Sequence, residues 1–461
     1  MPKQPTEIEL EITSLSDQGL GGGTHNERPI WVRNALPGET VSARILKRRG
    51  GNRFADGQPL AQHHPDRVSS PCRYFPRCGG CVTHHLASGA QLSHKQGQLQ
   101  TQLQVQGVEA QHWRPPTALL RLGYRRKARL GVRVVGDAVL VGFRESFSNR
   151  VARIDDCLTL TPELSRLILP LKAAIAKMAD PKTVPQIELA QGDDRCAVIV
   201  RHLQPLSAEE EALWQAFQQH SGAVVLMQSK GYDTLRPVLA EPGQGQLPLL
   251  HYSIPEYGVS VGFHPHHFTQ VNAPMNRELI RTAMGYLGNV RGQVVIDMFC
   301  GIGNFSMPLA RAGAQVVGLE ASAEAVQMAT QNAKANAVAH ASVFFDEDLY
   351  GAGGVIPPVD EAAAQPSSAV DLHSRLCHFG LPPRALILDP PRSGAGPNLE
   401  GWALLPSLDQ IVYVSCNPVT FAEDAKRLAG CGFSLSQVGV YDMFPGTAHV
   451  ETVGHFVRKP V

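Results

Sequence analysis

Short strand-like runs separated by turn residues occupy the N-terminal part of the chain. Residues 8–12 alternate apolar and polar side chains with a period of two, and further apolar runs follow at 30–32 and 41–46. The glycine cluster at 19–23 and the turn at 37–39 are expected to separate these strands. Closely spaced short strands of this kind predict a small β-barrel.

The middle of the chain mixes strand-like runs with helical stretches, which predicts an α+β domain. The strand-like runs lie at 128–135, 139–143, 196–202 and 223–228. Ahead of them, leucines spaced along a polar segment predict a helix over 91–106. Proline and glycine near 242–248 indicate a joint between domains.

Strands and helices alternate regularly from about residue 291 onward. Apolar runs at 294–296 and 315–319 predict strands, and the stretches 305–312 and 323–336 predict helices. This βαβ rhythm is typical of a doubly wound parallel sheet. A segment rich in Gly, Pro, Ala and Ser at 351–383 interrupts the rhythm, and we expect it to form a loop.

These patterns together predict a multidomain α/β protein with three parts. The first part is the N-terminal β-barrel over residues 1–62. The central α+β domain is assigned to residues 67–90 and 119–250. A Rossmann-like C-terminal domain is assigned to residues 91–118 and 251–461.

Composition narrows the classes of function. The chain has 461 residues, 43% of them hydrophobic, which is ample for several cores. The net charge is only +1, so any basic surface for a nucleic acid has to be local. No apolar run approaches the ~20 residues of a membrane span, and the N-terminus lacks a secretory signal, so we expect a cytoplasmic protein. Nine cysteines in such a protein favour metal binding or catalysis over disulfides.

Two chemically interesting motifs each follow a predicted strand. Asp389 begins an acidic Pro-Pro turn after one apolar run, and Cys416 follows another. In an open α/β sheet, ligands bind outside the carboxyl ends of the strands, so both motifs are expected to face one cleft. Cys416 is therefore a candidate nucleophile. The alternative is a small buried cysteine at a strand end.

A glycine-containing turn follows the first strand of the predicted parallel sheet. The segment 297–305 contains Gly301 and Gly303, and Glu320 ends the next strand. Glycine lets the backbone approach a ligand, and an acid about 20 residues further on suits ribose hydroxyls. A dinucleotide site is the alternative, but the third glycine expected for a pyrophosphate is missing. The pattern favours a nucleoside cofactor without phosphates, and S-adenosylmethionine fits.

Four cysteines form a possible metal-binding set. Cys72, Cys78 and Cys81 have C-x5-C-x2-C spacing, and Cys157 follows much later in the chain. Four thiolates hold either a zinc ion or an iron–sulfur cluster, and the spacing alone leaves both open.

Several motifs in a fixed order resemble those of the RNA uracil-C5 methyltransferases. They are the turn at 297–305, the segment 389–394, the motif at 415–418, the C-terminal segment 449–452 and the upstream motif at 268–272. The resemblance covers nearly the whole chain, and the N-terminal barrel resembles a TRAM domain, an RNA-binding module. It implies an enzyme that uses S-adenosylmethionine to make 5-methyluridine.

The resemblance also implies residue roles. Cys416 would attack uracil C6 as a thiolate, and Glu451 would be the general base that removes the C5 proton. The implied cofactor contacts are Gln270, Phe299, Asn304, Glu320, Asp348 and Asp389. The family often has Asn where this chain has Asp348, and Asp389 is also a candidate for contact with the flipped base. The cysteine quartet, Cys72, Cys78, Cys81 and Cys157, resembles the [4Fe–4S] site of the ribosomal RNA branch.

The barrel and the cysteine quartet together resemble the 23S rRNA branch of the family more than its tRNA branch. We therefore expect a single-stranded or extruded uridine in 23S rRNA as substrate. The basic segments 47–49 and 124–129 are candidate RNA contacts, with a solvated surface as the alternative for each. Two rival functions remain, a tRNA uracil-C5 methyltransferase and a non-catalytic RNA-binding protein. Neither a membrane nor an obligate protein partner is indicated.

Overall fold

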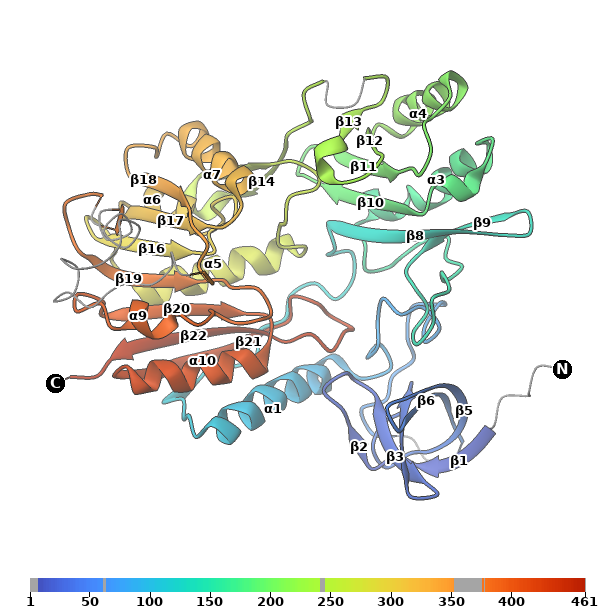
Figure 1. The fold of residues 1–461 in the computed structure, drawn as a ribbon. Coiled ribbons are helices and arrows are strands. Elements are labelled where there is room, and N and C mark those ends of the chain that lie inside the picture. Colours follow the sequence, from blue (N-terminus) through green and yellow to red (C-terminus); the bar gives the residue numbers. More distant parts are fainter. Residues whose placement is uncertain (1–6, 61–63, 241–244, 352–374, 377, 461) are drawn as a thin grey trace. The chain divides into compact units, whose positions relative to one another are not determined.

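The computed structural model describes residues 7–60, 64–240, 245–351, 375–376 and 378–460 (Figure 1). The chain forms two compact units, each assembled from separate segments. Unit one comprises residues 1–94, 120–248 and 444–449, and unit two comprises residues 95–119, 249–443 and 450–461. Unit one holds both the barrel and the central domain, so the three-part division stays a prediction. None of the described helices is both long and apolar enough to cross a lipid bilayer.

A six-stranded sheet forms the N-terminal barrel that the sequence predicts. Its strands are β1 (Glu7–Glu11), β2 (Ser14–Leu15), β3 (Gly21–His25), β4 (Arg28–Arg33), β5 (Thr40–Arg49) and β6 (Asn52–Pro59). They lie in the order β1-β5-β6-β4-β3-β2. Alternate side chains point inward, because the side-chain period of a strand is two. Leu10, Ile30 and Val41 are among the residues of the small apolar core that results.

The prediction of a turn over the whole glycine cluster at 19–23 is wrong for its last three residues. Gly21, Gly22 and Gly23 lie in strand β3. A Cβ at residue 21 would lie 2.8 Å from the carbonyl oxygen of Ala35, so the strand passes too close to its neighbour for a side chain. These glycines therefore allow neighbouring backbone to pack closely. A sequence pattern alone does not distinguish such glycines from glycines that form a turn.

A second six-stranded sheet lies in unit one. Its strands are β8 (Lys127–Val135), β9 (Ala138–Gly142), β10 (Gln186–Gln191), β11 (Cys196–Arg201), β12 (Val224–Gln228) and β13 (Arg236–Pro237), in the order β13-β12-β11-β10-β8-β9. The sequence pattern did not predict β10, the strand that joins β8 to β11. The helical elements are α2 (Pro162–Ser165), α3 (Ile168–Ala176) and α4 (Ala208–Ser221), with 3-10 turns at Pro181–Thr183 and Tyr232–Thr234.

One face of this central sheet is apolar and packs against helices. Leu130, Ile187 and Val198 belong to a core that also contains Leu171 of α3 and Trp214 of α4. Helix α4 begins at a capping box, in which the Ser207 side chain and the Glu210 side chain each accept a backbone N–H of the other residue. The opposite face of the sheet is richer in polar residues.

Unit two is built around an eight-stranded sheet. Its strands are β7 (His112–Trp113), β16 (Val294–Met298), β17 (Gln315–Glu320), β18 (Ser342–Asp346), β19 (Pro383–Leu388), β20 (Gln410–Ser415), β21 (Phe433–Tyr441) and β22 (Glu451–Arg458). The order is β18-β17-β16-β19-β20-β22-β21-β7. A separate hairpin joins β14 (Leu250–Ile254) to β15 (Val259–Phe263), with a 3-10 turn at Pro255–Tyr257.

Helices cover both faces of this sheet. They are α1 (Ser88–Gln106), α5 (Ala273–Leu287), α6 (Ser306–Arg311), α7 (Ala323–Ala335), α9 (Leu399–Ala403) and α10 (Pro418–Gly430). Leu103, Trp402 and Phe421 place α1, α9 and α10 in one core, while α5, α6 and α7 pack elsewhere on the sheet (Figure 1). The doubly wound sheet is thereby confirmed. The loop predicted at 351–383 falls largely outside the described residues, and the joint predicted at 242–248 does so in part.

Substitution of Gly23 by alanine is expected to destabilise the barrel. A Cβ at residue 23 would lie 2.5 Å from the carbonyl oxygen of Glu11, and overpacking of this kind costs about 1–3 kcal/mol. Gly97→Ala in α1 is the matched control, because a Cβ there meets nothing within 4 Å and removes helix-interior glycine, a gain of about 0.5–1 kcal/mol. Thermal unfolding followed by circular dichroism compares the two. Equal stability of Gly23→Ala and the unsubstituted protein would contradict the close strand approach.

Candidate active site

The carboxyl edge of the sheet in unit two gathers residues from distant parts of the chain. Strands β16, β17, β19 and β20 run parallel, so the residues that follow them share one edge. Asp389 and Cys416 lie directly after two of these strands. Strand β22 runs antiparallel to β20 and therefore begins at this edge, at Glu451. The pairing of Ser415 with Thr452 sets Cys416 and Glu451 next to each other across the two strands.

Cys416 is half-buried at the end of β20. Asn417 caps α10 with its side chain, which accepts the Val419 backbone N–H at 3.1 Å, so the loop that carries Cys416 is fixed on its C-terminal side. Burial raises the pKa of the Cys416 thiol, and the neighbouring Glu451 adds to the rise. Arg392 opposes both effects, because a cation favours the thiolate.

Glu451 is buried, with an exposed fraction of 3%. Burial raises the pKa of Glu451 to about 8, and Asp389 contributes in the same direction. Arg392 and Lys95 lower it in part. A carboxyl group with such a pKa exchanges a proton near neutral pH, as a general base has to do.

Asp389 lies within this cluster and contacts a second predicted residue. Gln270 donates an Nε2–H bond to Asp389 Oδ2 at 3.4 Å. Burial raises the pKa of Asp389 to about 7, and the Gln270 hydrogen bond opposes the rise. Asp297, at the end of β16, was not predicted as a site residue. Burial raises its pKa to about 7 as well, while it accepts a hydrogen bond from Ser306 Oγ.

The glycine turn after β16 has space for a ligand. Phe299 and Gly301 have positive φ values of 62° and 54°, and a Cβ at residue 301 would meet nothing within 4 Å. The Glu320 carboxylate accepts backbone N–H groups from Gly301 at 3.2 Å and Ser322 at 3.0 Å. A carboxylate has about four acceptor positions, so Glu320 retains capacity for ribose hydroxyls. The turn and Glu320 together fit the nucleoside part of S-adenosylmethionine.

Two residues that the resemblance implies as cofactor contacts are engaged within the protein. The Asn304 side chain exchanges two hydrogen bonds with Asn276 and accepts the hydroxyl of Tyr252 at 2.9 Å. These bonds hold the glycine turn on α5 and β14. Asp348 is exposed, and its carboxylate accepts the backbone N–H of Tyr350 at 3.0 Å. The role of Asp348 as a cofactor contact stays a prediction.

A buried ion pair next to this cluster was not predicted from the sequence. Lys95 of α1 is 1% exposed, and its Nζ lies 2.7 Å from Asp442 Oδ1. Lys95 also lowers the pKa of Glu451. The only signal in the sequence was a lone lysine in an otherwise uncharged helix, and its buried position depends on packing that no local pattern reveals.

A histidine pair beside the segment that carries Gln270 was also missed. His266 and His267 each contact Glu324 of α7 through Nε2, at 2.7 and 3.0 Å. The Nδ1 of His267 accepts the backbone N–H of His264, so neutral His267 carries its proton on Nε2 and donates it to Glu324. Burial lowers the pKa of His267 to about 4. This arrangement serves as a clamp between the Gln270 segment and α7.

The four cysteines of the predicted metal set line one pocket in unit one, together with Tyr74, Phe143 and Ile154. Burial raises the pKa of Cys78 to about 11, and nearby thiols add to the rise. Burial raises the pKa of Cys81 further. Ionised thiolates at these positions are therefore unfavourable unless a bound cation offsets their negative charge, as a metal ion does.

Known proteins resemble this chain in both sequence and fold. Residues 257–459 match the family model described as tRNA (Uracil-5-)-methyltransferase, and residues 4–60 match the TRAM domain. A protein of Hahella chejuensis named 23S rRNA (uracil(1939)-C(5))-methyltransferase RlmD is 39% identical, over 99% of this chain and 98% of its own length. A protein of the same name from Acidithiobacillus ferrooxidans is 38% identical, over the same shares of both chains.

A solved structure shares the fold over nearly the whole chain. It is the tRNA (uracil-54, C5)-methyltransferase of Pyrococcus abyssi in complex with S-adenosyl-L-homocysteine. The TM-score is 0.70 at 24% sequence identity, with 98% of this chain and 100% of that chain covered. The likeness confirms the fold class.

The buried carboxyl groups are expected to make unit two less stable as the pH rises. Glu451 binds a proton more tightly in the folded protein, with a pKa of about 8, than in the unfolded chain, where the ordinary value is 4.5. The stabilisation from its protonated form is complete below about pH 4.5 and is lost as the pH rises through 8. Glu451→Gln is neutral at every pH, so it should flatten the loss of unfolding free energy between pH 5 and 8.5 by about 4 kcal/mol.

Urea unfolding at both pH values measures this effect. The matched control is Glu423→Gln on the exposed face of α10, which should keep the pH dependence of the unsubstituted protein. Parallel pH profiles for Glu451→Gln and the unsubstituted protein would argue against a raised pKa at Glu451.

Proposed function

Because the chain belongs to the RNA uracil-C5 methyltransferase family, we propose that it methylates C5 of a uridine in 23S rRNA, with S-adenosylmethionine as methyl donor. The observation that carries the proposal is the placement of Cys416 beside Glu451 at the sheet edge, next to an open glycine turn. The relatives from Hahella chejuensis and Acidithiobacillus ferrooxidans carry the same printed name over their full length, which favours 23S rRNA over tRNA.

The proposed chemistry begins at the Cys416 sulfur. The thiolate adds to uracil C6, a C6–S bond forms, and the C5=C6 electron pair moves toward the O4 carbonyl, so C5 becomes nucleophilic. S-adenosylmethionine supplies the methyl group that C5 takes up. The Glu451 carboxylate then removes the C5 proton, the C5=C6 bond re-forms, and the C6–S bond breaks to release Cys416.

Charged neighbours set the protonation states that these steps require. Arg392 favours both the thiolate of Cys416 and the carboxylate of Glu451. Lys95 acts on Glu451 from the buried side, while Asp442 balances the lysine charge. Asp389, with its raised pKa, would contact either the cofactor or the base, and the hydrogen bond from Gln270 supports this orientation.

The RNA has to present its uridine outside a base stack, because C6 is covered in a duplex. Phe268 precedes Gln270 by two residues and is 78% exposed, which is unusual for a phenylalanine and offers a stacking surface for a base. Arg125 and Arg126 of the predicted basic segment are partly exposed, but Tyr124 is buried and donates its hydroxyl to Pro445 O at 3.2 Å. Tyr124 therefore supports the fold and does not stack on RNA.

We further propose that Cys72, Cys78, Cys81 and Cys157 hold a [4Fe–4S] cluster. A closed tetrahedral zinc site keeps its sulfurs about 3.8 Å apart. Among the described residues, three possible ligand atoms lie within 4.8 Å of one another only at His266, His267 and Glu324. The sulfur atoms of the four cysteines are therefore spaced more widely than those of a zinc site. The wider spacing of the thiols supports a cluster rather than a single ion. Since methyl transfer moves no electron, the cluster would stabilise the surrounding loops.

Cys416→Ala is expected to abolish methylation, because the variant lacks the thiolate that adds to C6, while S-adenosylmethionine still binds. Glu451→Gln should permit addition and methyl transfer but block proton removal, so a methylated covalent RNA adduct should accumulate. Methyl transfer to 23S rRNA and to tRNA, together with denaturing gels for the adduct, measures both effects. Cys431→Ala, at the C-terminal end of α10, is the control and should keep its activity.

Near-normal turnover by Cys416→Ala would contradict the nucleophile. Methylation of tRNA with none on 23S rRNA would overturn the substrate and leave the reaction standing.

The anaerobically purified protein is expected to contain about four irons per chain. Cys157→Ser should lose iron and the absorption near 400 nm, because one of the four thiolates is gone. Cys196→Ser, on β11 outside the cysteine pocket, should keep both. Stoichiometric zinc in place of iron would refute the cluster.

A further inference from the structure

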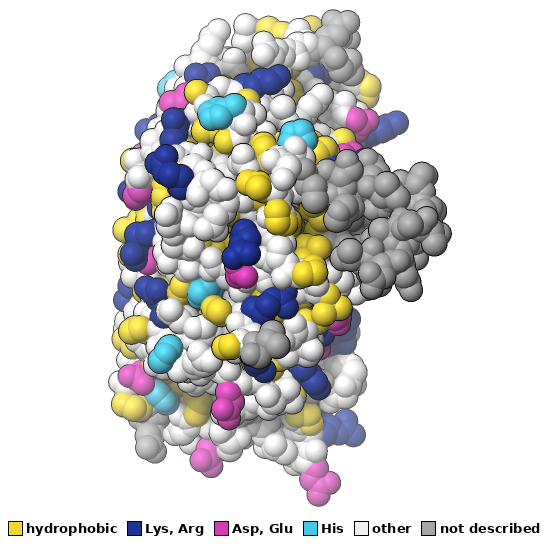
Figure 2. Space-filling model, turned by 90° about the vertical axis from the view of Figure 1, so that its left-hand side faces the viewer, with side chains coloured by type: hydrophobic (Ala, Val, Ile, Leu, Met, Phe, Trp, Pro, Cys, Tyr) yellow, Lys and Arg dark blue, Asp and Glu magenta, His cyan; other side chains and the backbone are white. Residues whose placement is uncertain are grey.

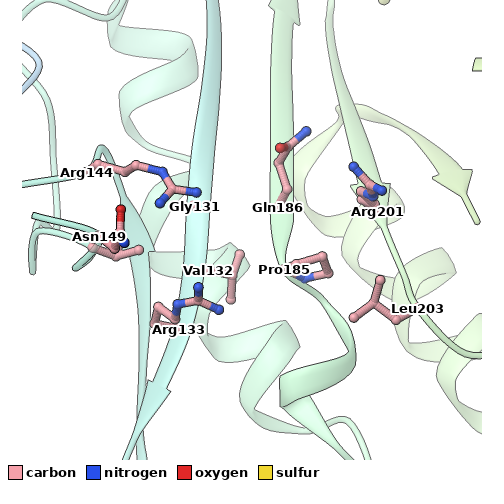
Figure 3. Close-up of a pocket in the computed structure, with 10 residues that line it drawn as sticks. Gly131, Val132, Arg133, Arg144, Asn149, Pro185, Gln186, Arg201 and Leu203 are labelled. Carbon is pink, nitrogen blue, oxygen red and sulfur yellow. The ribbon is translucent and has the colours of Figure 1, made fainter. Parts of the chain in front are cut away.

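A cavity on the polar face of the central sheet carries chemistry that the proposed active site does not use. It has a volume of about 310 Å³ and lies in unit one. Its lining includes Arg133, Arg144 and Arg201, with Asn149 and Gln186. Figure 3 shows these side chains over the same face of strands β8, β10 and β11.

The strand register explains why the cavity forms there. Gly131 of β8, Gln186 of β10 and Arg201 of β11 pair directly across the sheet and so share one face. At residue 131, glycine lets Val151 approach the sheet closely, because a Cβ there would lie 3.0 Å from Val151 Cγ2. Arg133 follows Gly131 by two residues, so its side chain emerges on the same face. Val132, which lies between them, points to the opposite face and into the core.

The three arginines carry charge that the nearby acids do not neutralise. Among the described residues, no carboxylate lies within 4.0 Å of their guanidinium nitrogens. Glu188 is close on β10, but it pairs with Arg129. The Nε of Arg201 is buried and, within the described part of the chain, lacks a hydrogen-bond partner. A buried donor without a partner is costly and is satisfied by a bound acceptor.

A second, larger cavity extends this basic surface. Its volume is about 1130 Å³, and it shares Arg133, Asn149 and Val151 with the first. Its lining adds the arginines at positions 73, 77, 150 and 153, with Glu145 as one acidic residue, which pairs with Arg77. By contrast, on the face of the molecule in Figure 2, basic and acidic side chains are interspersed. A small anion would fill one cavity only, whereas a polymer with repeated negative charge fits both.

We propose that this arginine groove binds the phosphate backbone of the RNA substrate, with Arg133, Arg144 and Arg201 around one phosphodiester. This inference rests on the proposed function for the identity of the RNA. The planar guanidinium donates paired N–H bonds to phosphate oxygens, which makes arginine well suited to this contact. Contacts to the backbone fix the position of the RNA and carry no base specificity.

The test uses Arg133→Gln and Arg201→Gln in the full-length protein, with Arg195→Gln as the matched control. Arg195 lies in the same domain, is half-exposed, and pairs with its neighbour Asp194 outside the groove. Binding of a 23S rRNA fragment is measured across a salt series. Each groove variant should bind about fivefold to tenfold more weakly, with a log–log salt slope shallower by about 0.7–1. The control should match the unsubstituted protein in both quantities.

Two further measurements distinguish RNA binding from a purely structural role of the arginines and from binding of a small anion. Arg201→Lys keeps the charge, so its salt slope should be preserved; a shallow slope there, with lowered thermal stability, would mean that Arg201 supports the fold only. Inorganic phosphate is titrated as the small anion. Phosphate binding that the variants lose while RNA affinity stays unchanged would overturn the RNA assignment, as would unchanged affinity and slope in both variants.

The outcome is independent of the methylation assay. If the unsubstituted protein binds the fragment and the groove variants bind it weakly, the groove stands even if no methyl group is transferred. In that case the proposed reaction fails and the inferred RNA contact does not.

Discussion

The burial of three carboxyl groups at one sheet edge is the constraint on which unit two depends. Glu451, Asp389 and Asp297 lie where parallel and antiparallel strand ends meet, and burial favours their protonated forms. Like charges cannot all ionise at such an edge without nearby cations. Arg392 supplies one positive charge from the open side, and Lys95 supplies another from within the protein.

Lys95 can serve this purpose only because Asp442 holds it. Both side chains are almost fully buried, and a buried pair is tolerated when its charges are matched by close contact. Removal of one partner typically costs about 3–5 kcal/mol, since the other charge is left in the interior. Helix α1, which is far from the catalytic motifs in the sequence, is therefore part of the electrostatic environment of Glu451.

The sequence was sufficient to predict those residues whose place follows from a strand end. Asp389, Cys416 and Glu320 each follow or end an apolar run, and parallel strands bring such positions together. Glu451 could be predicted only from a family motif, because its position depends on the antiparallel register of β22 with β20. Lys95 could not be predicted, since nothing local marks a lysine as buried.

The direction of side chains was the second property that the sequence could not reveal. Asn304 stands in the cofactor turn, yet its amide is bonded to Asn276 and Tyr252, and a sequence cannot tell which way an amide points. Gly21 to Gly23 were misread because glycine serves tight packing and turns alike. The arginine groove could not be predicted either, because no local pattern marks its members at positions 133, 144 and 201. Only the strand register brings them together.

The insertion of β22 between β20 and β21 has a consequence for biosynthesis. Strand β22 is the last of the three to leave the ribosome, yet it occupies the middle of the sheet. Until it arrives, β20 and β21 present unpaired edges that invite contacts with other chains. Glu451 is missing from the nascent protein during that interval. The sheet is therefore most open to aggregation until β22 has paired with both of its neighbours.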